Sequence, residues 1–162
     1  MTIKSRNKTS GADNQQERLK FAYWIAGFTD GEGCFSIAVI NNKTTKFGKQ
    51  IFPEYVVTQG AKSLSALKKI NKFFGCGNIF VNKRYDNHNE NLYRYCVRSL
   101  SELDSKIIPF FEKYQLHTYK QNDFLIFKKV IKAMIQKEHL TESGRNKILK
   151  LVSKMNRKKR RI

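Results

Sequence analysis

The chain has 162 residues, with 32 Lys or Arg against 13 Asp or Glu, so its formal net charge is +19. This length suits one domain and is too short for two ordinary ones. The charge predicts a polyanionic partner, although a ribosomal protein would share it. Hydrophobic residues at 40% and aromatic residues at 12% exclude a disordered basic tail, so we expect the charge to be carried on a folded unit.

Cysteine spacing and the length of apolar runs indicate the cellular environment of the protein. Cys34, Cys76 and Cys96 show no CxxC spacing and are odd in number, which indicates a reducing intracellular environment. The longest apolar runs, such as FSIAVI, are far shorter than the roughly 20 residues that cross a bilayer, so no membrane association is expected. Frequent Lys, Asn, Ile, Phe and Tyr favour an organellar or AT-rich genome.

The N-terminal region divides into a polar stretch and an apolar one. Residues 1–16 lack periodicity and are predicted to be a flexible basic arm. From Glu17 to Phe28, apolar residues recur at helical spacing on more than one side, which predicts a buried helix ending at Gly31 and Gly33. We expect residues 17–156 to form a single domain and residues 157–162 a basic tail that is solvated or follows phosphates.

Two strand pairs and further helices follow in chain order. CFSIAVINN and GKQIFPEYVVTQG read as one hairpin, and NIFVNKRY and LYRYCVRS as a second. Between them SLSALKKINKFFG predicts a helix with Ser63 as N-cap and Gly75 as its stop. Helices are also predicted over 101–114, 120–137 and 142–155, the last one capped by Thr141. The result is an α+β fold with one antiparallel sheet, helices on one face and the other face open.

Alternation along the strands predicts which side chains share the open face. A curved face that carries Arg, Gln, Asn and Ser suits a DNA major groove, and an ordinary solvated face is the alternative. Because Pro53 cannot donate to a ladder it belongs at an edge or bulge, and a register slip there would invert the set. The predicted DNA-facing residues are Ser36, Ala38, Ile40, Asn42, Gln50, Phe52, Glu54, Phe80, Asn82, Arg84, Arg94, Cys96 and Arg98, with Lys43, Lys46 and Lys49 on the loop reaching phosphates.

The stretch GFTDGEG carries the strongest chemical signal. Gly27 and Gly31 are four residues apart on one helical face, where another backbone could approach closely. Asp30 and Glu32 add negative charge to a helix end that is already partly negative, which is unfavourable unless a cation binds. A glycine-rich cap with solvated acids is the alternative reading. A calcium loop is disfavoured because Cys34 stands where an oxygen ligand is required.

WIAGFTDGEG, Trp24 to Gly33, resembles the signature of LAGLIDADG homing endonucleases, whose nine letters fall on Ile25 to Gly33. FFEKYQLHTYKQNDFLIFKKV and KEHLTESGRNKILKLVSKMN are similar to later helices of that family. The resemblance implies an αββαββα homing-endonuclease saddle with one antiparallel four-stranded sheet and additional C-terminal helices, the sheet lying in the major groove.

A single signature in the chain implies a homodimer that hydrolyses both strands of a pseudo-palindromic double-stranded DNA site. The dimer interface implied by the resemblance comprises Ala26, Gly27, Asp30 and Gly31. An intron-encoded, organellar protein is implied, with the mitochondrion expected and the chloroplast as alternative. Two other readings remain: an RNA maturase that binds intron RNA without cleaving DNA, and a catalytically silent DNA-binding regulator.

The resemblance also assigns catalytic roles. Glu32 would bind Mg²⁺, with Mn²⁺ as a substitute and the Gly31 carbonyl as a second ligand. Gln59 would order water, and Lys120 would polarise water or stabilise developing charge, a role that Lys62 or Arg84 could share. Asp30 is expected to be structural. The chain departs from relatives at residues 60–63, where some of them place an arginine, and at Gln115, where a proline is frequent.

Overall fold

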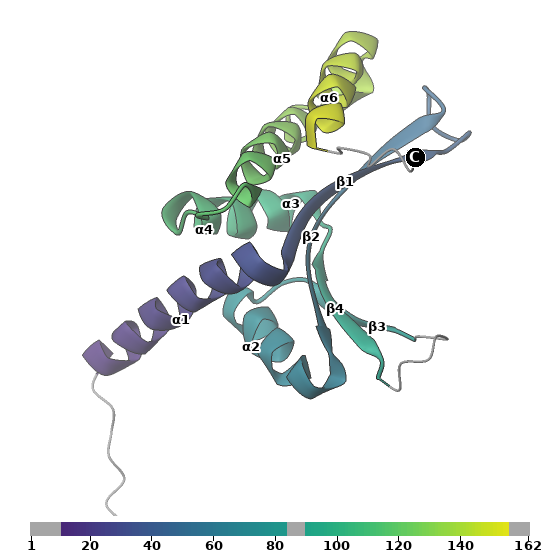
Figure 1. Ribbon diagram of the computed structural model, residues 1–162. Helices are drawn as coiled ribbons and strands as arrows, with labels where there is room; N and C mark the ends of the chain where they lie inside the picture. The colour runs from purple at the N-terminus through teal and green to yellow at the C-terminus, as the bar shows by residue number, and fades with distance from the viewer. Residues whose placement is uncertain (1–10, 84–89, 156–162) are drawn as a thin grey trace, which may run out of the picture.

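The computed structural model describes residues 11–83 and 90–155, whose arrangement Figure 1 shows. Their elements follow the predicted order: α1 (Gly11–Glu32), β1 (Gly33–Asn41), β2 (Lys49–Gly60), η1 (Ala61–Ser63), α2 (Leu64–Phe74), β3 (Asn78–Asn82), β4 (Leu92–Val97), α3 (Leu100–Glu102), η2 (Leu103–Ile107), α4 (Ile108–Lys113), α5 (Lys120–Ile135), η3 (Glu138–Leu140) and α6 (Glu142–Met155).

The four strands form one antiparallel sheet in the order β1-β2-β4-β3. Helices cover one face of this curved sheet, and the opposite face is free of them (Figure 1). The predicted α+β fold with a single antiparallel sheet and one open face is therefore confirmed. None of the described helices is long and apolar enough to cross a membrane.

The strand register is unbroken at Pro53. Pro53 pairs with Ile37 of β1, while β4 joins β2 only from Tyr55 onward. Proline therefore lies where β2 has no neighbour on its second side, which avoids a missing ladder hydrogen bond. Because no residue is skipped, the even-numbered strand residues share the open face and the odd-numbered ones face the helices.

Aromatic side chains dominate the core between the sheet and the helices. Phe35 and Tyr55 project from the sheet and meet Phe111 of α4 and Phe124 and Phe127 of α5, all at most 4% exposed. The ring centroids of Phe35 and Phe111 are 5.2 Å apart in an edge-to-face contact. Burying each such ring stabilises the fold by about 1.5–3 kcal/mol, so this cluster fixes α4 and α5 on the sheet.

Helix α1 begins earlier than the sequence pattern indicates. Residues 11–16, expected to belong to the flexible arm, are helical, and the first half of α1 extends away from the body of the protein (Figure 1). Periodicity could not reveal these turns because residues 13–20 are all exposed and have no apolar face. Residues 1–10 and the predicted tail 157–162 lie outside the described residues.

The helix predicted over 101–114 is interrupted by a π-helical turn, η2. Pro109 is the second residue after this turn, and because proline has no N–H it cannot donate to the carbonyl of Ser105. Helix α2 ends at Gly75 in the left-handed conformation, φ 58°, as predicted, whereas Ser63 makes no side-chain cap. The Thr141 hydroxyl accepts a 3.1 Å hydrogen bond from the Gly144 N–H and so caps α6.

Candidate active site and nucleic-acid interface

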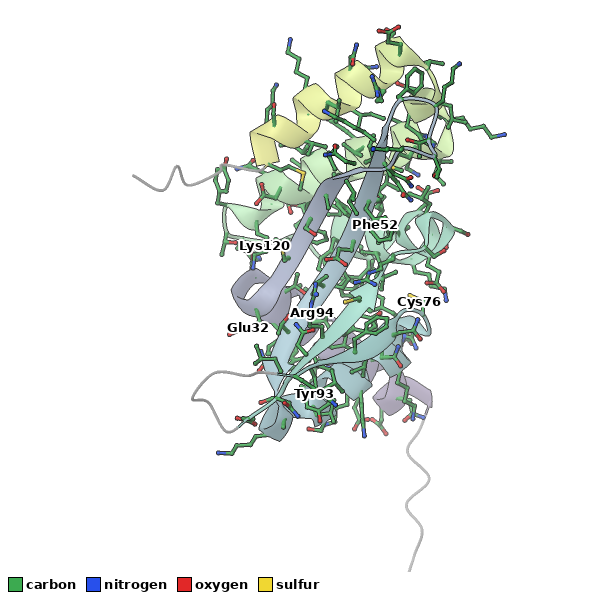
Figure 2. The ribbon with its side chains drawn as sticks, turned by 90° about the vertical axis from the view of Figure 1, so that its right-hand side faces the viewer. Glu32, Phe52, Cys76, Tyr93, Arg94 and Lys120 are labelled. Carbon is green, nitrogen blue, oxygen red and sulfur yellow. The ribbon has the colours of Figure 1, made fainter. Side chains whose placement is uncertain are left out.

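Lys120, the first residue of α5, closes the C-terminal end of α1. Its ammonium group donates to the carbonyl oxygens of Thr29 at 2.8 Å, Asp30 at 2.9 Å and Gly31 at 3.5 Å. The last carbonyls of a helix lack partners within the helix and carry partial negative charge. A cation therefore lies beside Glu32, at the edge of the sheet where α1 joins β1 (Figure 2).

Asp30 fixes the same helix end to the loop before α5. Its carboxylate accepts hydrogen bonds from the His117 N–H at 2.7 Å, the Thr118 N–H at 3.2 Å and the Thr118 hydroxyl at 2.7 Å. Partial burial opposes ionisation, but these donors and the Lys120 charge outweigh it and hold the pKa of Asp30 below its ordinary value. Both carboxylate oxygens thus face the protein's own chain, which supports a structural role for Asp30.

Thr29 and Tyr55 lock the last turn of α1 against β2. Both residues are 0% exposed, and their hydroxyl oxygens are 2.7 Å apart. A Cβ on Gly33 would lie 2.6 Å from the Thr29 methyl carbon and 2.9 Å from its carbonyl oxygen, so only glycine fits there. The sequence did not reveal this pair, because 26 residues separate its members. The backbone that carries Glu32 is consequently held from two sides.

Glu32 and Gln59 lie at one end of the sheet. Val57 pairs with Gly33, so Gln59 continues β2 two residues beyond that pair, toward the end of α1. Glu32 and Gly31 are exposed. Lys62 is exposed in η1, where its backbone N–H donates to the Glu90 carboxylate at 2.7 Å, and Arg84 lies outside the described residues.

The oxygen atoms available for a cation are the Glu32 carboxylate and the Gly31 carbonyl, a donor set of the kind that Mg²⁺ and Ca²⁺ prefer. Residues 11–83 and 90–155 contain no group of three or more His, Cys, Asp and Glu side chains that could hold a metal ion. A cation at this site would therefore need further oxygens from nucleic acid, water or a second copy.

Glu54 organises the arginines of the open face. Its carboxylate accepts from Arg94 Nη2 at 3.0 Å and from Arg98 Nε at 2.9 Å. The Arg98 guanidinium also lies over the rings of Phe80, at 5.2 Å, and Phe52, at 6.0 Å. Residues of β2, β3, β4 and the position directly after β4 thus form one network on the open face, and Figure 2 shows Arg94 and Phe52 on that side.

The register places the described members of the predicted DNA-facing set on the open face. All of them except Cys96 are at least partly exposed to solvent. Cys96, predicted as a DNA-binding residue, is only 2% exposed, so its thiol is not accessible to a base in the free protein. Strand parity gives the direction of a side chain but not its accessibility. The short Cys96 side chain lies between Arg94 and Arg98, which are longer and pair with Glu54 above it.

The tip of the β1–β2 hairpin is braced by α6. Lys43, Lys46 and Lys49 are exposed on this tip, as the phosphate-contact prediction requires. Arg145 donates from Nη1 to the Phe47 carbonyl at 3.0 Å, and its guanidinium carbon lies 4.3 Å from the centre of the Phe47 ring. Arg145 was absent from the predicted site because 98 residues separate it from Phe47.

One side of α1 exposes large apolar side chains and glycines. Tyr23 is 63% exposed and Trp24 40%. A Cβ on Gly27 or Gly31 would have no atom within 4 Å, so nothing in the described protomer requires glycine there. Ala26, predicted at the dimer interface, is 6% exposed in the single protomer, so it offers little surface for a contact.

Comparison with protein families finds a match to the LAGLIDADG endonuclease model over residues 25–131. The chain is 34% identical over 128 residues to probable intron-encoded endonuclease 2 of Neurospora crassa, covering 79% of this chain and 26% of the relative. It is 32% identical over 122 residues to an uncharacterized 50.9 kDa protein in ND4 intron 1 of Podospora anserina, covering 74% and 26%. The chain thus spans about a quarter of the length of these curated relatives.

Solved structures show the same similarity. The homing endonuclease I-TnaI is 40% identical, with a TM-score of 0.73, over 83% of this chain and 87% of that one. I-SmaMI, solved on an uncleaved DNA target in the presence of calcium ions, is 38% identical with a TM-score of 0.76, over 83% of this chain and 44% of that one.

Proposed function

Because the chain belongs to the LAGLIDADG endonuclease family, we propose that it hydrolyses both strands of a specific double-stranded DNA site as a homodimer. The observation that carries this function is the position of Glu32. It is an exposed carboxylate at the end of α1, beside the Lys120 ammonium and at the rim of an open face that carries arginines. A carboxylate and a cation at the edge of a nucleic-acid surface suit phosphodiester hydrolysis.

The open face of the sheet would bind the major groove. The Glu54 carboxylate holds Arg94 and Arg98 in fixed positions, which reduces the entropy lost when they meet base edges. Exposed lysines on the β1–β2 tip would contact phosphates, and the net charge of +19 favours association with a polyanion. The base-reading candidates on this face are Ser36, Ala38, Ile40, Asn42, Gln50, Phe52, Glu54, Phe80, Asn82, Arg94 and Arg98.

The exposed side of α1 would form the dimer contact. Gly27 and Gly31 leave room for a second backbone, and Tyr23 and Trp24 provide apolar area that is exposed in the single protomer. Two-fold pairing along this side brings two Glu32 carboxylates together. It also supplies the oxygen ligands that one protomer lacks.

The donor set at this end of α1 fits Mg²⁺, with Mn²⁺ able to replace it, and Glu32 and the Gly31 carbonyl would hold the ion. Bound there, a divalent cation would neutralise charge on the scissile phosphate and acidify a coordinated water. Lys120 already neutralises the end of α1, including the Gly31 carbonyl, and stands where developing negative charge appears. Gln59 would accept from and donate to a water at the same end of the sheet.

An organellar location follows from the relatives. Their names describe intron-encoded endonucleases and a protein in ND4 intron 1, which supports a product of an organellar intron, with the mitochondrion favoured. The frequent use of residues that AT-rich codons encode agrees with that origin.

Selection from a random pseudo-palindromic DNA library, with sequencing of the cleaved ends, tests the proposed function. The wild-type chain with Mg²⁺ is expected to cut one family of sites, and the Glu32→Gln variant to leave them intact. Cleavage by both proteins would remove Glu32 from the mechanism. No cleavage by either, together with tight binding to structured intron RNA, would favour the maturase alternative.

A further inference from the structure

We propose that Arg145 of α6 is a positioning residue that holds the tip of the β1–β2 hairpin and thereby sets which base pairs this tip can read. The hold on the tip is a property of the free protein. The effect on DNA reading rests on the proposed function.

The tip is a self-contained turn. The Asn42 N–H donates to the Gly48 carbonyl at 2.9 Å, the Gly48 N–H to the Thr45 carbonyl at 2.9 Å, and the Thr45 N–H to the Asn42 carbonyl at 3.1 Å. Gly48 has a φ of 66°, a conformation that glycine adopts without strain. Because these bonds are internal to the turn, they fix its shape but not its position relative to the rest of the protein.

A cavity of about 760 Å³ separates the base of the tip from the C-terminal helices. Its lining combines apolar residues of the sheet with apolar residues of α3, α5 and η3, among them Pro53, Leu100, Met134 and Leu140. Side chains that border such a space lose part of the packing contact that they would make in a filled core. Arg145 and Phe47 both line this space, and their contact joins its hairpin side to its α6 side.

Arg145 makes two different bonds to one residue. Nη1 donates to the Phe47 carbonyl at 3.0 Å, while the guanidinium carbon lies 4.3 Å from the centre of the Phe47 ring. A planar, delocalised cation can do both at once, whereas a lysine ammonium cannot. Backbone and side chain of the tip are therefore held by a single group.

The base of α6 is itself fixed. The Thr141 hydroxyl caps the Gly144 N–H, and the Arg145 N–H donates to the Thr141 carbonyl at 3.0 Å. Gly144 packs so closely on the Glu138 carbonyl that no side chain fits there. Arg145 thus projects from a rigid turn. Its target carries exposed lysines on both sides, Lys46 directly before Phe47 and Lys49 two residues after it.

Hydrogen exchange of the free protein tests the hold. In Arg145→Met, the amides of residues 42–48 are expected to exchange about tenfold faster, as befits the loss of one hydrogen bond and one cation–π contact. Lys150→Met removes the same charge from an exposed position of α6 and should leave these amides unchanged. Phe47→Leu removes the ring contact but keeps the carbonyl acceptor, so it should reproduce part of the effect, and the double variant should exchange no faster than Arg145→Met alone. Unchanged exchange in Arg145→Met would overturn the hold.

Two precautions keep this test decisive. Circular dichroism and melting establish that each variant is folded. If Arg145→Met does not fold, Arg145→Lys replaces it, since that variant keeps the charge but loses the planar contact, and it is expected to show the same faster exchange. Exchange at the wild-type rate in Arg145→Lys would then overturn the hold.

Binding to the DNA site selected by the wild-type chain tests the consequence. Arg145→Met should lower discrimination by about tenfold at the base pairs under the hairpin tip and leave the preference at the centre of the site intact. Lys150→Met should weaken binding to all sequences equally, if at all. Equal losses in both variants would show that Arg145 acts only through its charge. Absence of sequence-specific binding by the wild type would overturn the proposed function, while the exchange result would still decide the hold.

Discussion

The Lys120 ammonium group donates a 2.8 Å hydrogen bond to the carbonyl oxygen of Thr29, which joins the first residue of α5 to the last turn of α1. The same group reaches the carbonyls of Asp30 and Gly31, so one cation satisfies the end of the helix that carries Glu32. Structure and catalysis are expected to depend on this lysine together.

Lys120→Met should therefore lower both stability and cleavage, by unequal amounts. Losing a cation at a helix C-terminus costs about 0.3–2 kcal/mol in unfolding free energy. Losing a group that stabilises developing charge should slow cleavage by about 10²–10³-fold. Denaturant unfolding and single-turnover cleavage measure the two effects. Lys129→Met, at an exposed position of the same helix, is the control and should change neither.

A cleavage loss no larger than the loss of folded protein would assign Lys120 to structure alone.

Thr29→Val should leave the Tyr55 hydroxyl buried without its partner. The expected cost is about 1–3 kcal/mol of unfolding free energy, because an unsatisfied buried donor loses hydration without compensation. Tyr55→Phe removes the other partner, and the double variant should lose less than the sum of the two single ones. Urea denaturation of the four proteins gives the coupling. Strict additivity would mean that the two hydroxyls do not interact.

Asp30 should make the free energy of unfolding depend on pH in the acidic range. Its pKa in the folded protein is lower than in the unfolded chain, so the ionised carboxylate stabilises the fold above the ordinary pKa of 3.8, and this contribution disappears as pH falls through the folded value. Asp30→Ala should be less stable than wild type at pH 7, by about 1–3 kcal/mol for lost charged hydrogen bonds. The difference should shrink below about pH 4. A pH-independent difference in melting experiments would contradict this role.

Glu54→Gln should release Arg94 and Arg98 from their fixed positions. Removing a negative charge from the face proposed to bind DNA should raise affinity for random DNA, while discrimination between the selected site and variants should fall by about tenfold. Competition binding at constant salt measures both quantities. Glu142→Gln, which removes a carboxylate at an exposed position of α6, is the matched control. Unchanged discrimination in Glu54→Gln would show that the two arginines are positioned by other contacts.

Gly27→Leu should block pairing of α1 without harming the protomer. A side chain at this position meets no atom within 4 Å, and leucine is a better helix former than glycine by about 0.8 kcal/mol. The variant is therefore expected to be at least as stable as wild type, yet monomeric and inactive. Gly11→Leu, on the same helix and equally free of contacts, should stay dimeric. Sedimentation measures the oligomeric state of each variant, and a cleavage assay measures its activity. An active, dimeric Gly27→Leu protein would place the interface elsewhere.

The sheet could be predicted from the sequence because strand side chains alternate strictly and one face must be buried. Phe35, Ile37, Tyr55 and Tyr95 fix that parity, so the open-face residues follow from it. The resemblance assigned Glu32 and Lys120 to one catalytic site, a grouping that spacing alone could not supply, and Lys120 lies at the carbonyl of Gly31, the residue before Glu32.

Other features depend on contacts that a linear pattern does not contain. The Arg145–Phe47 contact links residues far apart in the chain, and the burial of Cys96 depends on the longer arginines beside it. Ala26 is covered within its own protomer although it neighbours the exposed Gly27, because one step along a helix turns a side chain by about 100°. The first turns of α1 carry no apolar stripe, so only helix propensity distinguishes them from an arm.

The mass of the protein–DNA complex, measured by sedimentation under conditions in which both strands are cut, tests the central claim most directly. Two chains on each duplex are expected, with Gly27→Leu leaving a single chain and an uncut site. A single wild-type chain that cuts both strands would contradict a mechanism in which two α1 helices deliver two Glu32 carboxylates.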